Sequence, residues 1–332
     1  MAHDLEFKNI LVIHFGQLGD VVLGLPALRA IRSHFPAAKI TTLSGSSTVE
    51  IIRLGDVSND QIAVDRVKLR DGNKLKSIFE IIRLVKDVRS RKFDLVVDIN
   101  SLYETNLLGF LSGARHRLYA NRENRSLDWL ANFPVKPPVE DKSMHHTDRY
   151  LAVLEPMELR GLERVVTITP PAESVEAARL FLATHQSKDR SLIGIFLGAG
   201  HPTRRWDIDK FVEVARRLSQ NPRNQTLIFL GPEEREIRGG LGEKFGDAAL
   251  VVDEMSLSDL AGMLSCLKVL VAGDTGPMHL GAGVGAGIVL LSEKGSPSIF
   301  RPLVTRLRVL DDRPLADITV DQVEAAALEL LK

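Results

Sequence analysis

The sequence predicts an α/β protein built from two similar halves, each a parallel sheet with helices on both faces. Short apolar runs such as 9–15 (NILVIHF) and 93–99 (FDLVVDI) have the continuous hydrophobicity of buried parallel strands. Segments with helical spacing of apolar residues alternate with these runs, and this alternation is typical of parallel sheets. The pattern starts again near residue 188, after an extended link that ends in Pro170-Pro171. A chain of 332 residues accommodates two such domains.

The first half alternates strands and helices up to residue 111. We expect strands at 9–15, 39–43, 61–64 and 93–99, and helices at 21–34, 46–54, 78–90 and 101–111.

The second half follows the same plan and ends in an amphipathic helix. We expect helices at 172–185, 206–219, 233–245, 258–266 and 319–331, and strands at 191–197, 226–230, 249–252, 269–272, 288–291 and 308–310. Thr319 or Asp321 is the expected N-cap of the last helix.

Residues 112–150 are less regular and rich in arginine and histidine, with one helix expected at 145–154. The plain interpretation is a solvated basic connection. The functional interpretation is a surface for a phosphorylated or acidic acceptor, because the arginine fork matches phosphate oxygens. Adjacent His145 and His146 indicate a metal site only weakly, since neighbouring side chains point apart.

Composition excludes several classes of function. Basic and acidic residues number 43 each, so the chain lacks the overall positive charge typical of nucleic-acid binding. The single cysteine, Cys266, rules out a disulfide framework and is expected to be a small core residue. No apolar run reaches the ~18–20 residues of a membrane span. The first residues, MAHDLEFKN, carry acids and no apolar signal region, so we expect a cytoplasmic protein.

The stretch Val269–Pro297 is the most informative part of the chain. An apolar strand ends at Gly273-Asp274-Thr275-Gly276, and a short small-residue helix is expected from Pro277. Free N–H groups at that helix N-terminus favour phosphate. Asp274 would lie just beyond the C-terminal end of a strand, where ligands of open α/β sheets bind.

Two further glycine-marked turns follow strands, at 16–20 and 198–200. Neither matches a dinucleotide or P-loop motif, and the chain has no nucleophile elbow. Asp20, after the first turn, is either a helix cap or a general base. Arg204 and Arg205, after the second, are either solvated surface or phosphate ligands. Trp206 is expected to pack.

Other polar residues near strand ends have two interpretations each. Glu233 and Glu234 would either cap a helix or bind ribose hydroxyls. His279 is either a hydrogen-bonded core histidine or a donor ligand.

Four stretches together resemble glycosyltransferase family 9, the ADP-heptose lipopolysaccharide heptosyltransferases. They are GQLGDVVLGLPALRAIRSHFP (16–36), GAGHPTRRW (198–206), LGPEERE (230–236) and LSDLAGMLSCLKVLVAGDTGPMHLGAG (257–283), and they occur in the family's order along nearly the whole chain.

The resemblance implies a GT-B fold, in which two Rossmann-like domains face each other across a cleft. It implies domains at 1–170 for the acceptor and 188–315 for the nucleotide sugar, with the terminal helix 316–332 packing back toward the first domain. It also implies inverting transfer from a nucleotide sugar, with ADP-heptose as the expected donor. The expected acceptor is a lipid-linked oligosaccharide of the lipopolysaccharide core.

By matching position, Asp20 takes the role of general base, and the donor is bound by Arg204, Glu234, Asp274, Thr275, Gly276 and His279. Gly19, Arg205, Glu233 and Met263 complete the set. No metal or cofactor is expected, because Arg204 and the helix N-terminus would hold the diphosphate. We also expect peripheral attachment of the first domain to the cytoplasmic face of the inner membrane, helped by the arginines of residues 115–125.

Two features depart from the family pattern. Ser292-Glu293-Lys294-Gly295 stands where relatives often have a Phe-Gly-Pro-like turn, and glycines stand at 281 and 283 where relatives often have alanine. The glycines indicate a short helix or a close backbone approach. Two alternatives remain, namely an inactive nucleotide-sugar-binding member and a nucleotide-sugar epimerase on a similar fold.

Overall fold

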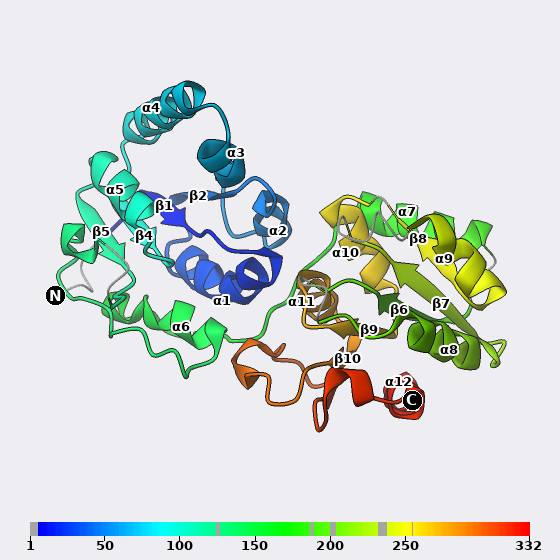
Figure 1. Ribbon diagram of the computed structural model, residues 1–332. Helices are drawn as coiled ribbons and strands as arrows, with labels where there is room; N and C mark the ends of the chain where they lie inside the picture. Colours follow the sequence, from blue (N-terminus) through cyan, green and yellow to red (C-terminus); the bar gives the residue numbers. More distant parts are fainter. Residues whose placement is uncertain are drawn as a thin grey trace. The chain divides into compact units, whose positions relative to one another are not determined.

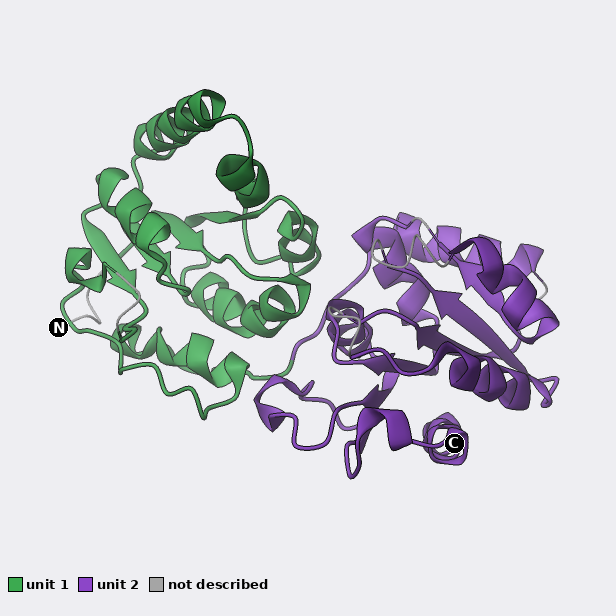
Figure 2. Cartoon of the chain, in the orientation of Figure 1, with its two compact units in different colours: residues 1–165 green, residues 166–332 purple. Residues whose placement is uncertain are grey.

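The computed structural model describes residues 6–123, 127–185, 187, 189–199, 204–231, 238–253 and 255–332. The chain divides into two compact units, Met1–Val165 and Val166–Lys332 (Figure 2). Each unit contains one sheet in which every pair of neighbouring strands is parallel. The predicted fold class is therefore confirmed.

The first sheet has the strand order β3-β2-β1-β4-β5. Its strands are β1 (Asn9–Ile13), β2 (Lys39–Gly45), β3 (Asp60–Val64), β4 (Leu95–Asp98) and β5 (His116–Tyr119). Its helices are α1 (Leu18–His34), α2 (Val49–Leu54), α3 (Arg66–Asp71), α4 (Lys74–Ser90), α5 (Tyr103–Leu111) and α6 (His146–Ala152).

Alternate residues of β1 face opposite sides of the first sheet, as the two-residue period of a strand requires. Leu11 and Ile13 join a core with Val88 of α4 and Leu108 of α5. The side chain of His14, the next residue, points to the opposite face and contacts α1. A Cβ on Gly24 of α1 would lie 2.3 Å from the Nε2 of His14. Helices of this unit therefore cover both faces of its sheet.

The second sheet has the order β11-β10-β9-β6-β7-β8. Its strands are β6 (Ser191–Phe196), β7 (Asn224–Phe229), β8 (Leu250–Val252), β9 (Val269–Gly273), β10 (Gly287–Leu291) and β11 (Leu307–Leu310). Its helices are α7 (Ala172–Thr184), α8 (Ile208–Ser219), α9 (Arg238–Phe245), α10 (Leu257–Ser265), α11 (Gly276–Gly283) and α12 (Val320–Leu331) (Figure 1).

The terminal helix α12 belongs to the core of the second unit. Its buried Val323 and Ala327 pack with Val214 of α8 and with Val269 and Val271 of β9. Thr319 caps the helix and accepts a hydrogen bond from the backbone N–H of Gln322 at 3.3 Å. Of the two residues expected as the N-cap, the structure therefore shows Thr319 and not Asp321. That α12 also returns to the first domain stays a prediction.

The structure corrects several local predictions, among them helix boundaries such as the start of α4, at Lys74 instead of residue 78. Helix α1 begins at Leu18, three residues earlier than expected, so Pro26 lies in its interior. Residues 116–119 form the edge strand β5 instead of an irregular connection. Helix α3, at 66–71, was not expected, because it is a short polar turn of helix with no fully buried residue.

Candidate functional site

In the first unit, the strand order reverses between β1 and β4, because β2 and β3 lie on one side of β1 and β4 and β5 on the other. Open α/β sheets bind ligands at the carboxyl ends of the strands flanking such a reversal. The two strand ends are held together by Asn100, whose Oδ1 accepts from the backbone N–H of Phe15 at 2.9 Å. The same oxygen lies 2.6 Å from Nδ1 of His14.

The loop after β4 is fixed by the buried carboxylate of Asp98. It accepts hydrogen bonds from the backbone N–H groups of Asn100 and Ser101, from the Thr105 hydroxyl and from the Asn106 amide. Burial raises the pKa of Asp98 to about 6, although these donors oppose the rise. The carboxylate is therefore charged at neutral pH and orders the loop that presents Asn100.

Asp20 stands in the first turn of α1, at this reversal point. Its Oδ2 accepts a hydrogen bond from the backbone N–H of Gln17, the N-cap residue, at 3.0 Å. A Cβ on Gly16 would lie 2.6 Å from the Cβ of Asp20, so only glycine lets the turn approach this closely. The glycine-marked turn thus serves to place one carboxylate, whose side chain stays about one-third exposed.

The second oxygen of Asp20, Oδ1, faces His146 of α6, with 3.8 Å to its Nδ1. Nη1 of Arg149 lies 2.7 Å from Nε2 of His146. Because guanidinium groups only donate, Nε2 is the acceptor and the imidazole proton resides on Nδ1, toward Asp20. Burial, reinforced by the charge of Arg149, lowers the pKa of His146 to about 4, so the ring is neutral at neutral pH.

A cavity of about 170 Å³ adjoins this cluster on the side of α6. Glu140 and Arg149 line it and form an ion pair, and Arg122 adds a second contact to Glu140 Oε1 at 3.1 Å. Burial acts to raise the pKa of Glu140, but the two arginines lower it more, and the net result is below its usual value. Polar and charged groups thus line a cavity that meets the cluster at Arg149 and Tyr150, the two residues that also contact His146.

In the second unit, the strand order reverses between β6 and β9. Phe196 of β6 pairs with Ala272 of β9, so the segments that follow both strands start side by side. A Cβ on Gly273 would lie 3.8 Å from the carbonyl oxygen of Arg204 and 4.0 Å from that of Gly198. Two of the glycine-marked turns predicted from the sequence therefore meet at this reversal.

Helix α11 begins at the end of β9 as expected, with proline in its first turn. Thr275 is its N-cap, and the Oγ1 accepts from the backbone N–H of Met278 at 3.4 Å. Asp274 precedes it and is partly exposed, with Oδ1 3.7 Å from Nε2 of the nearly buried His279. Gly276 opens the helix, so its N–H is one of the unpaired donors of the first turn.

The glycines of α11 allow both a short helix and a close approach. A Cβ on Gly281 would lie 2.6 Å from Cδ2 of Leu270, and one on Gly283 would lie 3.0 Å from Cδ1 of Ile168. The backbone of Gly283 also accepts from the N–H of Ile168 at 2.8 Å. The helix therefore lies directly on β9, and its N-terminus is held at the strand end.

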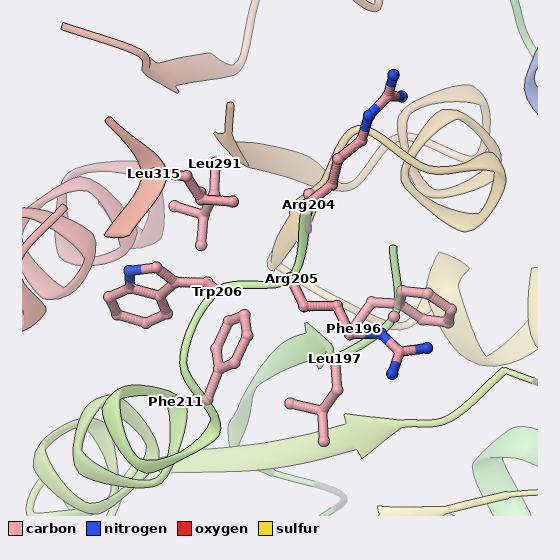
Figure 3. Close-up of a pocket in the computed structure, with 10 residues that line it drawn as sticks. Phe196, Leu197, Arg204, Arg205, Trp206, Phe211, Leu291 and Leu315 are labelled. Atoms are coloured by element: carbon pink, nitrogen blue, oxygen red, sulfur yellow. The ribbon is translucent and has the colours of Figure 1, made fainter. Parts of the chain in front are cut away.

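Arg204 is exposed at the rim of this region, and its side chain points away from the apolar cluster around Trp206 and Phe211 (Figure 3). Trp206 is buried, contacts Phe211 edge-on and donates from Nε1 to the carbonyl of Ile318 at 3.2 Å. Trp206 is therefore a packing residue, as expected. The depression that these residues line is too tight for a water molecule, so it forms a floor rather than a ligand cavity.

The remaining predicted residues have different outcomes. Glu233 and Glu234 lie outside the described residues. Gly19 lies in the first turn of α1, next to Asp20 in the sequence. Arg205 directly follows Arg204 and is half-buried. Met263 is fully buried in α10, so its side chain offers no surface to a ligand.

Three residues of the first unit were missed as site residues, namely His14, Asn100 and Tyr150. His14 and Asn100 are polar residues at the ends of apolar runs, which is a usable signal. Tyr150 contacts the rings of both His14 and His146 edge-on, and only the tertiary structure brings it there. Across the described part of the chain, no three His, Cys, Asp or Glu side chains come together as a metal site.

The sequence profile described as "Glycosyltransferase family 9 (heptosyltransferase)" matches residues 81–319. Among curated proteins, lipopolysaccharide heptosyltransferase 3 of Escherichia coli is 21% identical over 289 residues, which cover 86% of this chain and 83% of that protein.

Two solved structures show the same fold over nearly the full length. The glycosyl transferase family 9 protein of Veillonella parvula has a TM-score of 0.86 at 24% identity, covering 100% of this chain and 98% of that one. Escherichia coli heptosyltransferase WaaC, solved with ADP-2-deoxy-2-fluoro heptose, has a TM-score of 0.75 at 19% identity, covering 97% and 99%. These similarities confirm the predicted GT-B fold.

A more distant likeness connects the chain to UDP-GlcNAc 2-epimerase of Methanocaldococcus jannaschii. Its TM-score is 0.55 at 12% identity, covering 98% of this chain and 93% of that one. The epimerase fold is thus related, but it is clearly less similar than that of the family 9 structures.

Proposed function

The chain belongs to glycosyltransferase family 9, and we propose that it transfers a heptose from an ADP-sugar to a lipopolysaccharide-core acceptor, with inversion at the anomeric carbon. One observation carries this proposal. Polar residues lie at the strand-order reversal of each sheet. The first unit has a carboxylate that can act as a base, and the second has hydrogen-bond donors that can bind phosphate.

The second unit is proposed to bind the donor. Negative charge develops on the diphosphate as it leaves, and fixed N–H dipoles and cations stabilise that charge. The N-terminus of α11 supplies the N–H of Gly276, because Pro277 has none and the N–H of Met278 already donates to Thr275. The exposed Arg204 supplies a guanidinium. Asp274, with His279 behind it, is proposed to bind sugar hydroxyls. We propose that these groups, without a metal ion, carry the charge of the diphosphate.

The first unit is proposed to supply the general base. An inverting displacement needs one group to accept the proton of the acceptor hydroxyl, and it needs no covalent nucleophile. Asp20 has one oxygen engaged by Gln17 and the other directed toward His146 without reaching hydrogen-bond distance. That second oxygen is the one we assign to the acceptor hydroxyl.

The acceptor is proposed to be lipid-linked and to be reached at the cytoplasmic face of the inner membrane. Among the described residues, no helix is long and apolar enough to cross a membrane. Contact with the membrane would then be peripheral. The relatives named above support the acceptor class, since the curated protein is a lipopolysaccharide heptosyltransferase.

The proposal is tested by incubating the purified protein with ADP-heptose and a purified lipid-linked core acceptor. We expect ADP release together with an acceptor heavier by one heptose in the mass spectrum, and an anomeric configuration in the product opposite to that of the donor. A UDP-sugar is the matched control donor. ADP binding without any product would indicate an inactive member, and isomerised donor without transfer would indicate an epimerase.

A further inference from the structure

Helix α4 (Lys74–Ser90) presents large apolar side chains to solvent. Leu75 is 70% exposed and Phe79 is 73% exposed, and Ile78 and Ile82 follow at 52% and 45%. These four residues have the i, i+3, i+4, i+7 spacing of a single helix face. We call this set the α4 stripe. A contiguous exposed apolar surface of this kind marks an interaction site more often than a solvated one.

The stripe is not the face by which α4 packs on its own unit. The only fully buried residues of α4 are Ser77 and Val88, and Val88 joins the first core together with the partly buried Leu84 and Val85. At 100° per residue, the centre of this packed face lies about 120–130° around the helix from the centre of the stripe. The apolar surface of α4 is therefore wider than the face that packs within the chain. Figure 1 shows α4 next to α3.

Positive charges flank the stripe. Both acids of α4 are already paired, Glu80 with Lys68 at 3.3 Å and Asp87 with Arg91 at 3.0 Å. In the part of the chain that the structure describes, five cations on the helix form no ion pair. Arg89 donates to the carbonyl of Leu111, and the other four are Lys74, Lys76, Arg83 and Lys86. An apolar stripe bordered by lysine and arginine is the pattern of a helix that lies in a membrane interface.

We propose that the α4 stripe inserts into the surface of an anionic lipid bilayer. Leu75 and Phe79 would enter the acyl boundary, while the four flanking cations contact lipid phosphates. Charge selects this occupant over a second copy of the chain, because two α4 stripes face to face would bring like charges together. The inference deepens the proposed function by naming its membrane surface, and it rests on that function only for the need to reach a lipid-linked acceptor.

The basic surface expected at 115–125 is a weaker candidate. Arg117 donates to the carbonyls of Leu130 and Ala114, and Arg122 contacts Glu140. Two of its arginines are thus engaged within the unit, whereas the cations of α4 stand beside exposed apolar side chains. We therefore place the proposed membrane contact on α4, while the contact expected at residues 115–125 stays a prediction.

The test is co-sedimentation of the full chain with vesicles of phosphatidylcholine and phosphatidylglycerol. We expect the wild type to bind, and the double variant Leu75→Ser/Phe79→Ser to bind at least about tenfold more weakly, because two apolar anchors are lost. Leu180→Ser is the matched control, since Leu180 is 66% exposed on α7 and lies outside the stripe. It should bind like the wild type.

The charge contribution is tested separately with Lys74→Gln/Lys76→Gln. This variant should bind anionic vesicles about tenfold more weakly and show a flatter dependence on salt, because each interfacial cation adds to the attraction and is screened by ions. Circular dichroism and thermal unfolding of all variants should match the wild type, since every substituted side chain is exposed.

Three results would overturn the proposal. The first is that the wild type does not bind vesicles, and the second is that the wild type and the stripe variant bind equally. The third is that the wild type forms a dimer in solution, which Leu75→Ser/Phe79→Ser dissociates, and does not bind vesicles. The assay contains neither donor nor acceptor, so its failure leaves the transferase proposal intact. A failure of sugar transfer would in turn leave vesicle binding intact.

Discussion

The geometry of Asp20 is compatible with both roles that the sequence left as alternatives. One carboxylate oxygen accepts from the N–H of Gln17, which is a helix-capping contact. The other oxygen lies 3.8 Å from the nitrogen of His146 that carries the proton. A cap and a base are therefore compatible in one residue, because each uses a different oxygen. The cap fixes the direction in which the second oxygen points.

His146 gives a prediction at the residue scale. Its pKa is about 4 in the folded protein, below the ordinary histidine value of 6.5, because the ring is buried. Between these values the unfolded chain binds a proton that the folded chain does not, so the free energy of unfolding falls as the pH is lowered from 7 toward 4. At roughly pH 5 this loss amounts to about 2 kcal/mol.

The measurement is urea unfolding of the wild type and of His146→Gln at several pH values. Glutamine does not titrate, so the variant lacks this proton uptake. The stability of the wild type relative to the variant should therefore decline by about 2 kcal/mol between pH 7 and pH 5. Taking the difference between the two proteins removes the opposite contribution of Asp98, whose raised pKa favours the folded state as the pH falls. A constant difference would contradict the assigned burial of His146.

At the scale of elements, the sequence predicted the features that depend on residues close together in the chain. The strand–turn–helix around Asp274, the proline in the first turn of α11 and the Thr319 cap follow from short-range chemistry, and all three are present. The hydrogen bond between His14 and Asn100 joins residues that are 86 positions apart, so no local sequence pattern predicts it. Likewise, the periodicity of α4 revealed an amphipathic helix but not which apolar face would be left exposed.

The contact between α10 and α7 gives a prediction at the same scale. A Cβ on Gly262 would lie 2.6 Å from the backbone oxygen of Ser174, and backbone has little freedom to move. Gly262→Ala should therefore destabilise the protein by ~1–3 kcal/mol, the usual cost of overpacking, despite better helix propensity.

Gly242→Ala is the matched control. Gly242 lies in α9, is exposed, and has nothing within 4 Å of an added Cβ. Alanine there should stabilise the protein by ~0.5–1 kcal/mol. Thermal unfolding of both variants provides the comparison. Opposite signs are expected, and a stabilised Gly262→Ala would contradict the close approach of α10 to α7.

At the scale of the whole molecule, the two units are proposed to carry different chemistry. Each unit has its own sheet, its own core and its own strand-order reversal. Asp20 belongs to the first unit, and Arg204, Asp274 and the N-terminus of α11 belong to the second. If the first unit supplies the base and the second unit binds the donor, a substitution in one unit should impair one function and spare the other.

The most direct test compares Asp20→Asn with Arg204→Ala, measuring ADP affinity by calorimetry and transfer by steady-state kinetics on the same preparations. Asparagine can still accept from Gln17, so Asp20→Asn should keep the wild-type affinity for ADP while turnover falls by ~10²–10⁴. Arg204→Ala should weaken ADP binding by ~1.5–3 kcal/mol. Wild-type turnover in Asp20→Asn would make Asp20 a helix cap only, and would contradict the assignment of the base to the first unit.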